Sequence, residues 1–421
     1  MINKLDKKII FTCFLASFLE IYDFAIFGFF APVLHKNYLI FLDQSAATIV
    51  TYALFAVGFV FRPIGSLIFG YIGDVYGRKI SLVTSVSIMG SASLVMFLLP
   101  PYSSIGISAC YIIVLVRILQ GISVGGEFTG ALVFAVEHSK SNVGLVAGII
   151  SAGGACGVLL ANFVGKNIQN LALPDYGWRF AFLIGFGLSI VGFFIRRKLT
   201  DTPVFQKKDS KKIPLFEGFK YFKTESFATF CVAAANGTTF YFGSVFLGVL
   251  VKTTKPEIEA TYVSSLVSVT VALLLPIFGT VSDIIDRKKF LMFSSLVMGM
   301  YSLIALNAIV ETQSFVSVII LVFLYAFFAA MMIGSINIFS IEIFPTEQRM
   351  SCSSLFYSLG MGIVGGTVPM VSSYIIKYFG ITSNYIGIYI ALICFSSFLG
   401  AFLVYRKQKI SLKVQNKINR I

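Results

Sequence analysis

Charged residues are scarce in this chain of 421 residues: Asp, Glu, Lys and Arg make up 12% of it, and hydrophobic residues make up 57%. A soluble domain usually carries about 25% charged residues, because polar surface must cover its apolar core. Mean hydropathy is +0.88. The composition excludes a soluble domain, a disordered chain and a disulfide scaffold, and it indicates an integral membrane protein.

Patterns that bind metals, cofactors or nucleotides are also missing. The six cysteines and two histidines form no C-x-x-C pair and no Cys/His cluster, so zinc, haem and redox sites have no support. No G-x-x-x-x-G-K-[ST] loop is present to cradle a phosphate, which argues against an ATP-driven pump. His35 and His138 stand at span ends, where neither can join a nucleophile and an orienting group. We therefore expect no metal, no cofactor and no enzymatic activity.

Long apolar runs are what the sequence does contain. A helix needs about 20 apolar residues to cross a bilayer core of about 30 Å. The runs predict an all-α polytopic membrane protein with twelve transmembrane helices. They cover residues 9–34, 46–70, 80–99, 105–134, 143–165, 178–195, 226–250, 260–281, 290–310, 315–341, 350–376 and 384–405.

The net charge of +14 is explained by where the basic residues fall. If the N-terminus is cytoplasmic, only Arg62 and Arg117 lie within spans, and six of the 33 basic residues lie in outside loops. The positive-inside rule then places both termini in the cytoplasm. The basic excess is a topology signal with weak attraction to anionic lipid, so we expect a lipid bilayer and no nucleic acid as partner.

An internal repeat divides the chain into two halves. Gly70-x-x-x-Asp74-x-x-x-Arg78-Lys79 recurs 209 residues later as Gly279-x-x-x-Asp283-x-x-x-Arg287-Lys288, each after an equivalent span. Such repeats are typical of transporters built from two related bundles. The predicted organisation is a six-helix bundle over residues 1–195, a cytoplasmic linker over 196–224, a second six-helix bundle over 225–405 and a short basic tail over 406–421.

The repeated motif resembles the signature loop of the major facilitator superfamily, although Val75 and Asp286 depart from its usual pattern. Further motifs resemble those of its metabolite:H+ symporter family, which carries proline and betaine, α-ketoglutarate, citrate and shikimate. They are Leu19–Phe24 in the first span, Phe61–Gly65 in the second, Arg117–Glu127 in the fourth, Gly177–Phe180 before the sixth, and Glu342–Thr346 and Gly365–Pro369 around the eleventh.

The resemblance implies the major facilitator fold and a gate at the cytoplasmic ends of the spans. In the family, such motif residues form salt bridges that hold the inner gate shut. Simple anchoring of the topology by interfacial charges is the alternative. The predicted gate residues are Asp74, Arg78, Glu137, Asp283, Arg287 and Glu342.

Ionisable residues within the spans are expensive, at about 2.5–3.5 kcal/mol each near a helix centre unless they are paired or hydrated. The sequence has five: Glu20, Asp23, Arg62, Arg117 and Glu127. Depths estimated from a rise of 1.5 Å per residue place Arg62 level with Glu127 and bring Asp23 near Arg117. Three acids against two bases leave one carboxylate without a partner.

An unpartnered carboxylate in a low dielectric can hold a proton near neutral pH. We expect Asp23 or Glu20 to carry the proton, Arg117 to sense that charge, and Arg62 with Glu127 to gate the site. Static ion pairs that only fix helix packing are the alternative. The predicted substrate-binding residues are Tyr22, Gln120, Asn236, Tyr241, Asn337 and Tyr357, although most aromatic residues here must serve packing.

These features predict proton-coupled symport of a small polar metabolite, either a proline/betaine-like zwitterion or an organic acid, by alternating access. A proton-independent facilitator or exchanger of the same fold is the alternative. A channel would need a selectivity filter or a ring of charges, against which the repeat argues. We expect a bacterial inner (plasma) membrane protein that works as a monomer.

Overall fold

The structure is a computed structural model that describes residues 4–41, 50, 53–54, 56–139, 141–170, 176–200, 220–382 and 384–418. Within these residues, twelve helices are long and apolar enough to cross a membrane, so the predicted all-α, twelve-span fold is confirmed. The elements are α1 (Lys4–Tyr38), α3 (Arg62–Val75), α4 (Arg78–Leu98), α5 (Tyr102–Ile105), α6 (Ser108–His138), α7 (Val143–Asn170), α8 (Trp178–Arg197), α10 (Lys223–Tyr241), η1 (Phe242–Phe246), α11 (Leu247–Thr254), α12 (Ala260–Ile284), α13 (Arg287–Glu311), α14 (Phe315–Glu342), α15 (Arg349–Ser358), η2 (Leu359–Gly365), α16 (Val368–Phe379) and α17 (Tyr385–Ile418).

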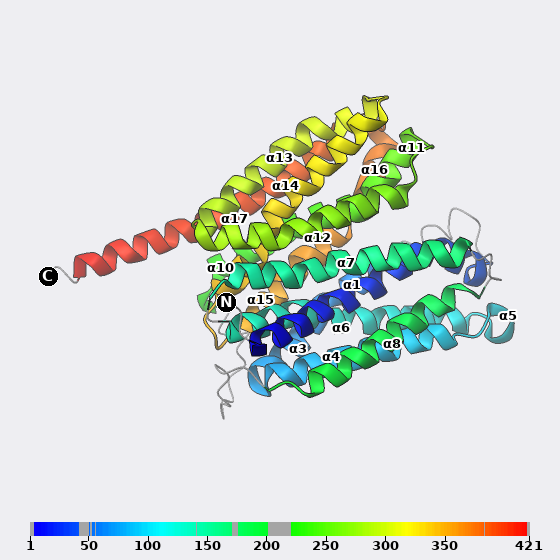
Figure 1. Ribbon diagram of the computed structural model, residues 1–421, viewed down its shortest axis with the longest axis horizontal. Helices are drawn as coiled ribbons and strands as arrows, with labels where there is room; N and C mark the ends of the chain where they lie inside the picture. Colours follow the sequence, from blue (N-terminus) through cyan, green and yellow to red (C-terminus); the bar gives the residue numbers. More distant parts are fainter. Residues whose placement is uncertain are drawn as a thin grey trace.

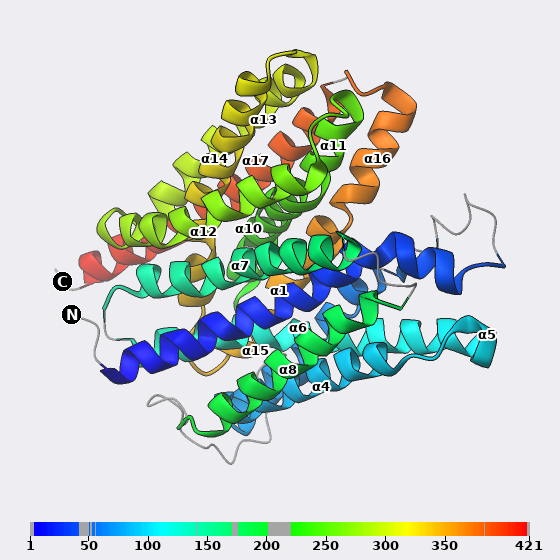
Figure 2. The same ribbon diagram turned by 45° about the vertical axis from the view of Figure 1, so that its right-hand side comes forward.

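The helices form two bundles, α1–α8 and α10–α17, here called the N-half and the C-half (Figure 1). Helices α7 and α12 run side by side between them (Figures 1 and 2). Both chain ends lie at one end of the molecule, which we call the terminus end; α5 and α11 lie at the opposite end. The α7–α12 pair is therefore one long line of contact between the halves.

Glycines allow this pair to approach backbone to backbone. A Cβ atom on Gly144 would lie 2.3 Å from the Gly279 carbonyl oxygen, and one on Gly148 would lie 2.4 Å from that of Leu275. Real Cβ atoms essentially never come within 3.0 Å of such atoms. Small residues let membrane helices pack this closely.

Two of the spans depart from regular α-helix within the described residues. The seventh contains the π-helical segment η1, and the eleventh contains η2. π-Helical segments occur mostly as single turns inside α-helices, and they are frequent at functional sites. A Cβ on Gly365 of η2 would lie 2.5 Å from the Cα of Gly237, so these spans touch where one of them is irregular.

Large apolar side chains cover the outer faces of both bundles, as expected for a lipid-facing surface; Phe163, Leu273 and Ile304 are exposed. The molecule is a multi-pass membrane protein. Helix α8 continues to Arg197 and α17 to Ile418, so helix extends beyond the predicted edges of linker and tail. Residues 201–219 of the predicted linker lie outside the described residues.

Candidate functional site

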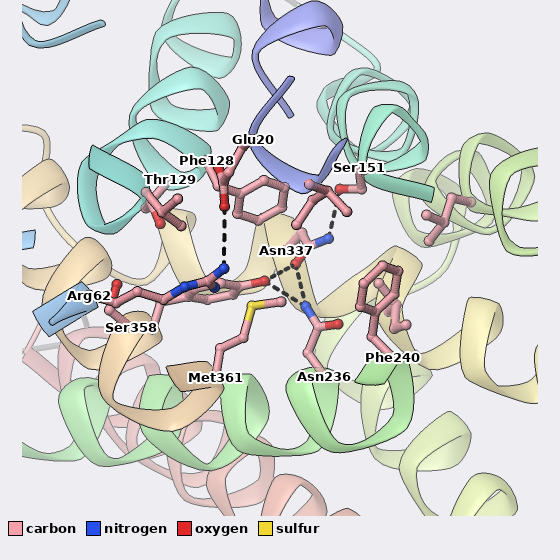
Figure 3. A pocket seen from close by; sticks show the side chains of 16 residues that line it. Glu20, Arg62, Phe128, Thr129, Ser151, Asn236, Phe240, Asn337, Ser358 and Met361 are labelled. Carbon is pink, nitrogen blue, oxygen red and sulfur yellow. Dashed lines mark hydrogen bonds and ion pairs between the residues drawn. The ribbon is translucent and has the colours of Figure 1, made fainter. Parts of the chain in front are cut away.

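A cavity of about 40 Å³ lies between the two halves near the middle of the spans (Figure 3). On the scale on which about 10–15 Å³ holds one water, it has room for about three. Its own side chains therefore nearly fill it. The N-half contributes Glu20, Arg62, Phe128, Thr129 and Ser151, and the C-half contributes Asn236, Phe240, Asn337, Tyr357, Ser358 and Met361.

The N-half face of the cavity is ionic. Arg62 and Glu20 form an ion pair of 3.7 Å between Nη2 and Oε1, and both side chains are almost fully buried. Neither Glu20 Oε2 nor Arg62 Nη2 has a hydrogen-bond partner within the described structure. A buried pair with unused hydrogen-bonding capacity can accept a polar ligand, because an unmade bond to a charged group is costly.

Close packing of α3 on α6 fixes the position of Arg62. A Cβ on Gly65 would lie 1.9 Å from the Ile122 carbonyl oxygen, and one on Gly125 would lie 2.1 Å from that of Arg62. The motifs Phe61–Gly65 and Arg117–Glu127 thus supply the glycines that bring these two backbones together. The guanidinium also stacks on Phe24 and Phe59, at 4.9 and 4.8 Å from their ring centroids.

The C-half face is built from amides and a phenol. Asn236 Nδ2 donates to Asn337 Oδ1 at 3.0 Å and to the Tyr357 hydroxyl at 2.6 Å. The Tyr357 hydroxyl donates to Asn337 Oδ1 at 3.0 Å. Asn337 Nδ2 donates to Ser151 Oγ at 2.7 Å, which joins the C-half to α7 of the N-half (Figure 3). A polar ligand could replace these bonds without leaving the amides unsatisfied.

Three of the six predicted substrate residues line the cavity, namely Asn236, Asn337 and Tyr357. The other three point elsewhere in this state. The Tyr22 hydroxyl donates to the Ala181 carbonyl at 2.8 Å, and Gln120 accepts from Arg117. Tyr241 packs on the Phe59 ring. Tyr22 follows Glu20 by two residues, which turns it about 200° around the helix and away from the cavity.

Asp23 lies behind the cavity, against α8. A Cβ on Gly185 would lie 2.3 Å from Asp23 Oδ1. Neither carboxylate oxygen of Asp23 has a hydrogen-bond partner among the described residues. In place of the predicted contact with Asp23, Arg117 donates to the Leu54 carbonyl at 3.2 Å and to Gln120 Oε1 at 2.9 Å.

The predicted pairing of Arg62 with Glu127 is wrong. Glu127 Oε1 instead lies 2.7 Å from Arg196 Nη2, and both side chains are 1% exposed. Arg196 also donates to the Leu82 carbonyl at 2.9 Å. Arg62 and Glu127 have similar estimated depths in the bilayer, but depth does not determine the direction in which a side chain points from its helix.

Arg196 is a buried charge that the sequence reading missed, because the polar run that begins there was assigned to the linker. It adds a third base to the N-half interior and pairs with Glu127, whereas Asp23 is in no ion pair among the described residues. A signal was present: Gly185, Ser189, Gly192 and Arg196 share one face of α8 at helical spacing. That face packs on α4 and α1.

At the terminus end, the two repeated aspartates occupy equivalent places. Asp74 Oδ2 accepts from the Ser351 backbone N–H at 2.9 Å and from the Ser351 hydroxyl. Asp283 accepts from the backbone N–H groups of Gly144 at 2.8 Å and Leu145 at 3.1 Å. Ser351 and Gly144 stand in the first turns of α15 and α7, so each carboxylate caps a helix N-terminus of the other half, where anions are favoured.

The other predicted gate residues surround these aspartates. Arg78 contacts Asp74 and lies 3.4 Å from Glu137. Arg287 lies 2.7 Å from Asp283 and contacts Glu342. All six therefore gather into two related clusters that hold the halves together. We call these the Asp74 cluster and the Asp283 cluster.

At the opposite end, the described residues include one ion pair between the halves. Lys166 Nζ of α7 lies 2.7 Å from Glu259 Oε2, directly before α12, and it also donates to the Tyr262 hydroxyl. The hydrogen bond and charge of Lys166 hold the pKa of Glu259 below its ordinary value. No motif or spacing in the sequence predicts this pair.

A central polar cavity between two six-span halves, closed by paired clusters at one end, defines a membrane transporter. Comparison with known proteins gives its family: the profile of the Major Facilitator Superfamily matches residues 13–255 and 229–419. The chain belongs to the Major Facilitator Superfamily.

Curated relatives carry transporter names. The chain is 28% identical over 402 residues to a Staphylococcus aureus protein named "Putative proline/betaine transporter", covering 90% of this chain and 85% of the relative. It is 30% identical over 379 residues to the citrate-proton symporter of Salmonella typhi, covering 87% of each. The structure of the proton:xylose symporter XylE bound to 6-bromo-6-deoxy-D-glucose matches with a TM-score of 0.76 at 15% identity, over 96% of each chain. That last likeness shows the fold.

Proposed function

We propose that this transporter is a proton-coupled symporter of a small carboxylate-bearing metabolite, either a proline/betaine-like zwitterion or an organic acid. The observation that carries the proposal is the buried Glu20–Arg62 pair in the cavity, held at 3.7 Å with unused hydrogen-bonding atoms on both sides. The names of the proline/betaine and citrate-proton relatives support the same substrate classes.

In this proposal, Glu20 and the substrate carboxylate compete for one guanidinium. A proton that binds Glu20 neutralises it and releases Arg62 to bind the substrate. When the proton leaves, Glu20 reclaims Arg62 and the substrate carboxylate is released. Asp23 is a second position for a proton, and Arg117 senses its charge from the same half. The Asn236–Asn337–Tyr357 group binds the remaining polar atoms of the substrate.

Alternating access then requires the Asp74 and Asp283 clusters to open. Release of the helix N-termini of α15 and α7 would expose the cavity at the terminus end. We place this end in the cytoplasm of a bacterial cell and the protein in its inner membrane, in keeping with the basic loops. One chain contains the whole cavity, so a monomer suffices for function.

A proton-independent facilitator or exchanger is the second candidate. The two buried ion pairs of the N-half, Glu20–Arg62 and Glu127–Arg196, favour it, because paired charges need no proton. Both candidates share the cavity and the two clusters.

Uptake into proteoliposomes separates the two. Labelled proline, betaine, α-ketoglutarate, citrate and shikimate are offered with and without an inward proton gradient. Accumulation of one solute only with the gradient supports symport, whereas equilibration that ignores the gradient supports the facilitator. Glu20→Gln and Asp23→Asn test the proton sites. Glu225→Gln is the matched control, since Glu225 pairs with Lys407 at the terminus end. Full gradient-driven uptake by both test variants would overturn the proposal.

A further inference from the structure

Three aromatic rings cover the cavity on the side facing the opposite end. Phe59 is 2% exposed and packs edge-on against Phe24 at 5.3 Å and against Tyr241 at 5.1 Å, measured between ring centroids. Phe24 and Phe59 belong to the N-half and Tyr241 to the C-half. The contact between Phe59 and Tyr241 therefore closes a gap between halves.

The direction of the spans places these rings above the cavity. The second span runs towards Asp74 at the terminus end, and Phe59 precedes Arg62 by three residues. Helix α10 runs away from the terminus end, and Tyr241 follows Asn236 by five residues. At 1.5 Å per residue, the Cα atoms of Phe59 and Tyr241 lie about 4.5 and 7.5 Å closer to the opposite end than those of Arg62 and Asn236.

Glycines of the eleventh span leave room for the Phe59 ring. We call the position that the ring occupies against this span its seat. A Cβ on Gly366 would lie 2.6 Å from Phe59 Cγ, and one on Gly362 would lie 3.0 Å from the Phe59 carbonyl oxygen. The ring can take this position because Gly366 has no side chain, while Gly362 lets the backbone of Phe59 approach the eleventh span. Gly365 beside them packs on Gly237, which brings the seat and Tyr241 together.

We propose that Phe59 is the gate of the cavity towards the opposite end, and that Gly366 and Tyr241 form the seat on which its ring closes. Entry from that end requires the ring to leave the seat. The Arg62 guanidinium lies 4.8 Å from the centroid of the same ring, so movement of the gate is linked to the charged group in the cavity. That link rests on the proposed function; the gate itself does not.

The test measures access to the cavity without any substrate, so its outcome is independent of the proposed function. In full-length protein in nanodiscs, the six native cysteines are replaced by alanine and Thr129→Cys places one thiol in the cavity lining. The rate of its reaction with a water-soluble maleimide is then measured. Gly366→Ala should raise this rate by about tenfold or more, because the added methyl keeps the ring off its seat.

A double variant gives the sharper result. Phe59→Ala in the Gly366→Ala protein should label within about threefold of either single variant, because both changes open the same path and their effects should not add. Gly187→Ala is the control, since nothing lies within 4 Å of a Cβ at that position, and it should leave the rate unchanged.

Phe59→Ala keeps the inference testable if Gly366→Ala fails to fold, because removing the ring opens the same path and should raise the rate by a similar factor. Spin labels at Ser104 and Tyr374, both exposed at the opposite end, show which end responds. Their distance distribution should broaden or lengthen in Gly366→Ala. An unchanged labelling rate in Phe59→Ala would overturn the inference, as would faster labelling caused by opening at the terminus end.

Discussion

Neutralising Asp74 is expected to loosen the closure of the terminus end. Its carboxylate accepts two hydrogen bonds from Ser351 in the other half, and its side chain is fully buried. Bonds to a charged group contribute about 1.5–3 kcal/mol and neutral ones about 0.5–1.5, so Asp74→Asn loses roughly 1 kcal/mol from each. Loss of the anion at the α15 N-terminus adds about 0.3–1 kcal/mol.

The total is about 2–3 kcal/mol of closure free energy. Since each 1.4 kcal/mol is a factor of ten, the ratio of closed to open molecules at this end should fall about 30- to 140-fold. If most molecules are closed at this end, a change of this size makes the open molecules numerous enough to detect. Asp283→Asn should act in the same direction, because Asp283 caps α7 in the equivalent way.

Pulsed electron paramagnetic resonance measures this directly. Spin labels at Ser141 of the N-half and at Tyr221, two residues before α10 of the C-half, are both exposed at the terminus end and report the separation of the halves. Asp286→Asn is the matched control, because Asp286 caps only its own helix through Lys288 and Lys289. An identical distance distribution in Asp74→Asn and Asp286→Asn would refute the reasoning.

Three further outcomes are expected. Arg196→Leu should destabilise the protein by about 3–5 kcal/mol by leaving Glu127 buried and unpaired, and adding Glu127→Gln should recover most of that loss in thermal unfolding. Glu259 has a lowered pKa, so its pair with Lys166 persists above its ordinary pKa near 4.5 and is lost as the pH falls through the lowered value. The Ser104–Tyr374 label distance should then grow in acid, but not in Lys166→Gln. Gly185→Ala should slow uptake severalfold by pressing a methyl on Asp23, while Gly187→Ala should not.

Composition and spacing were sufficient to predict the twelve spans, because about 20 apolar residues in a row have one stable arrangement in a bilayer. The repeat also located Asp74 and Asp283 at equivalent helix ends. It could not show that each caps a helix of the other half, because those partners lie far away in the sequence and carry no matching motif.

The ion pairs were harder to predict, since helical spacing fixes only the relative position of residues on one helix. Glu20 and Glu127 both lie near the depth of Arg62, and the packing of α3 on α6 selects Glu20. Arg196 looked like part of a polar linker, although it belongs to a face of small residues on α8. In each case the ion-pair partner depends on the direction in which the side chain points in the folded protein, which a single sequence does not show.

Solute-driven proton movement tests the central claim most directly. Proteoliposomes containing a pH-sensitive dye are given the transported solute without a preset gradient, and the internal pH is followed. The account predicts that solute entry acidifies the interior in the unmodified protein and that Glu20→Gln loses this acidification while it still binds the solute. Acidification of equal size in Glu20→Gln, with Glu225→Gln also unchanged, would contradict a proton carried on the Glu20–Arg62 pair.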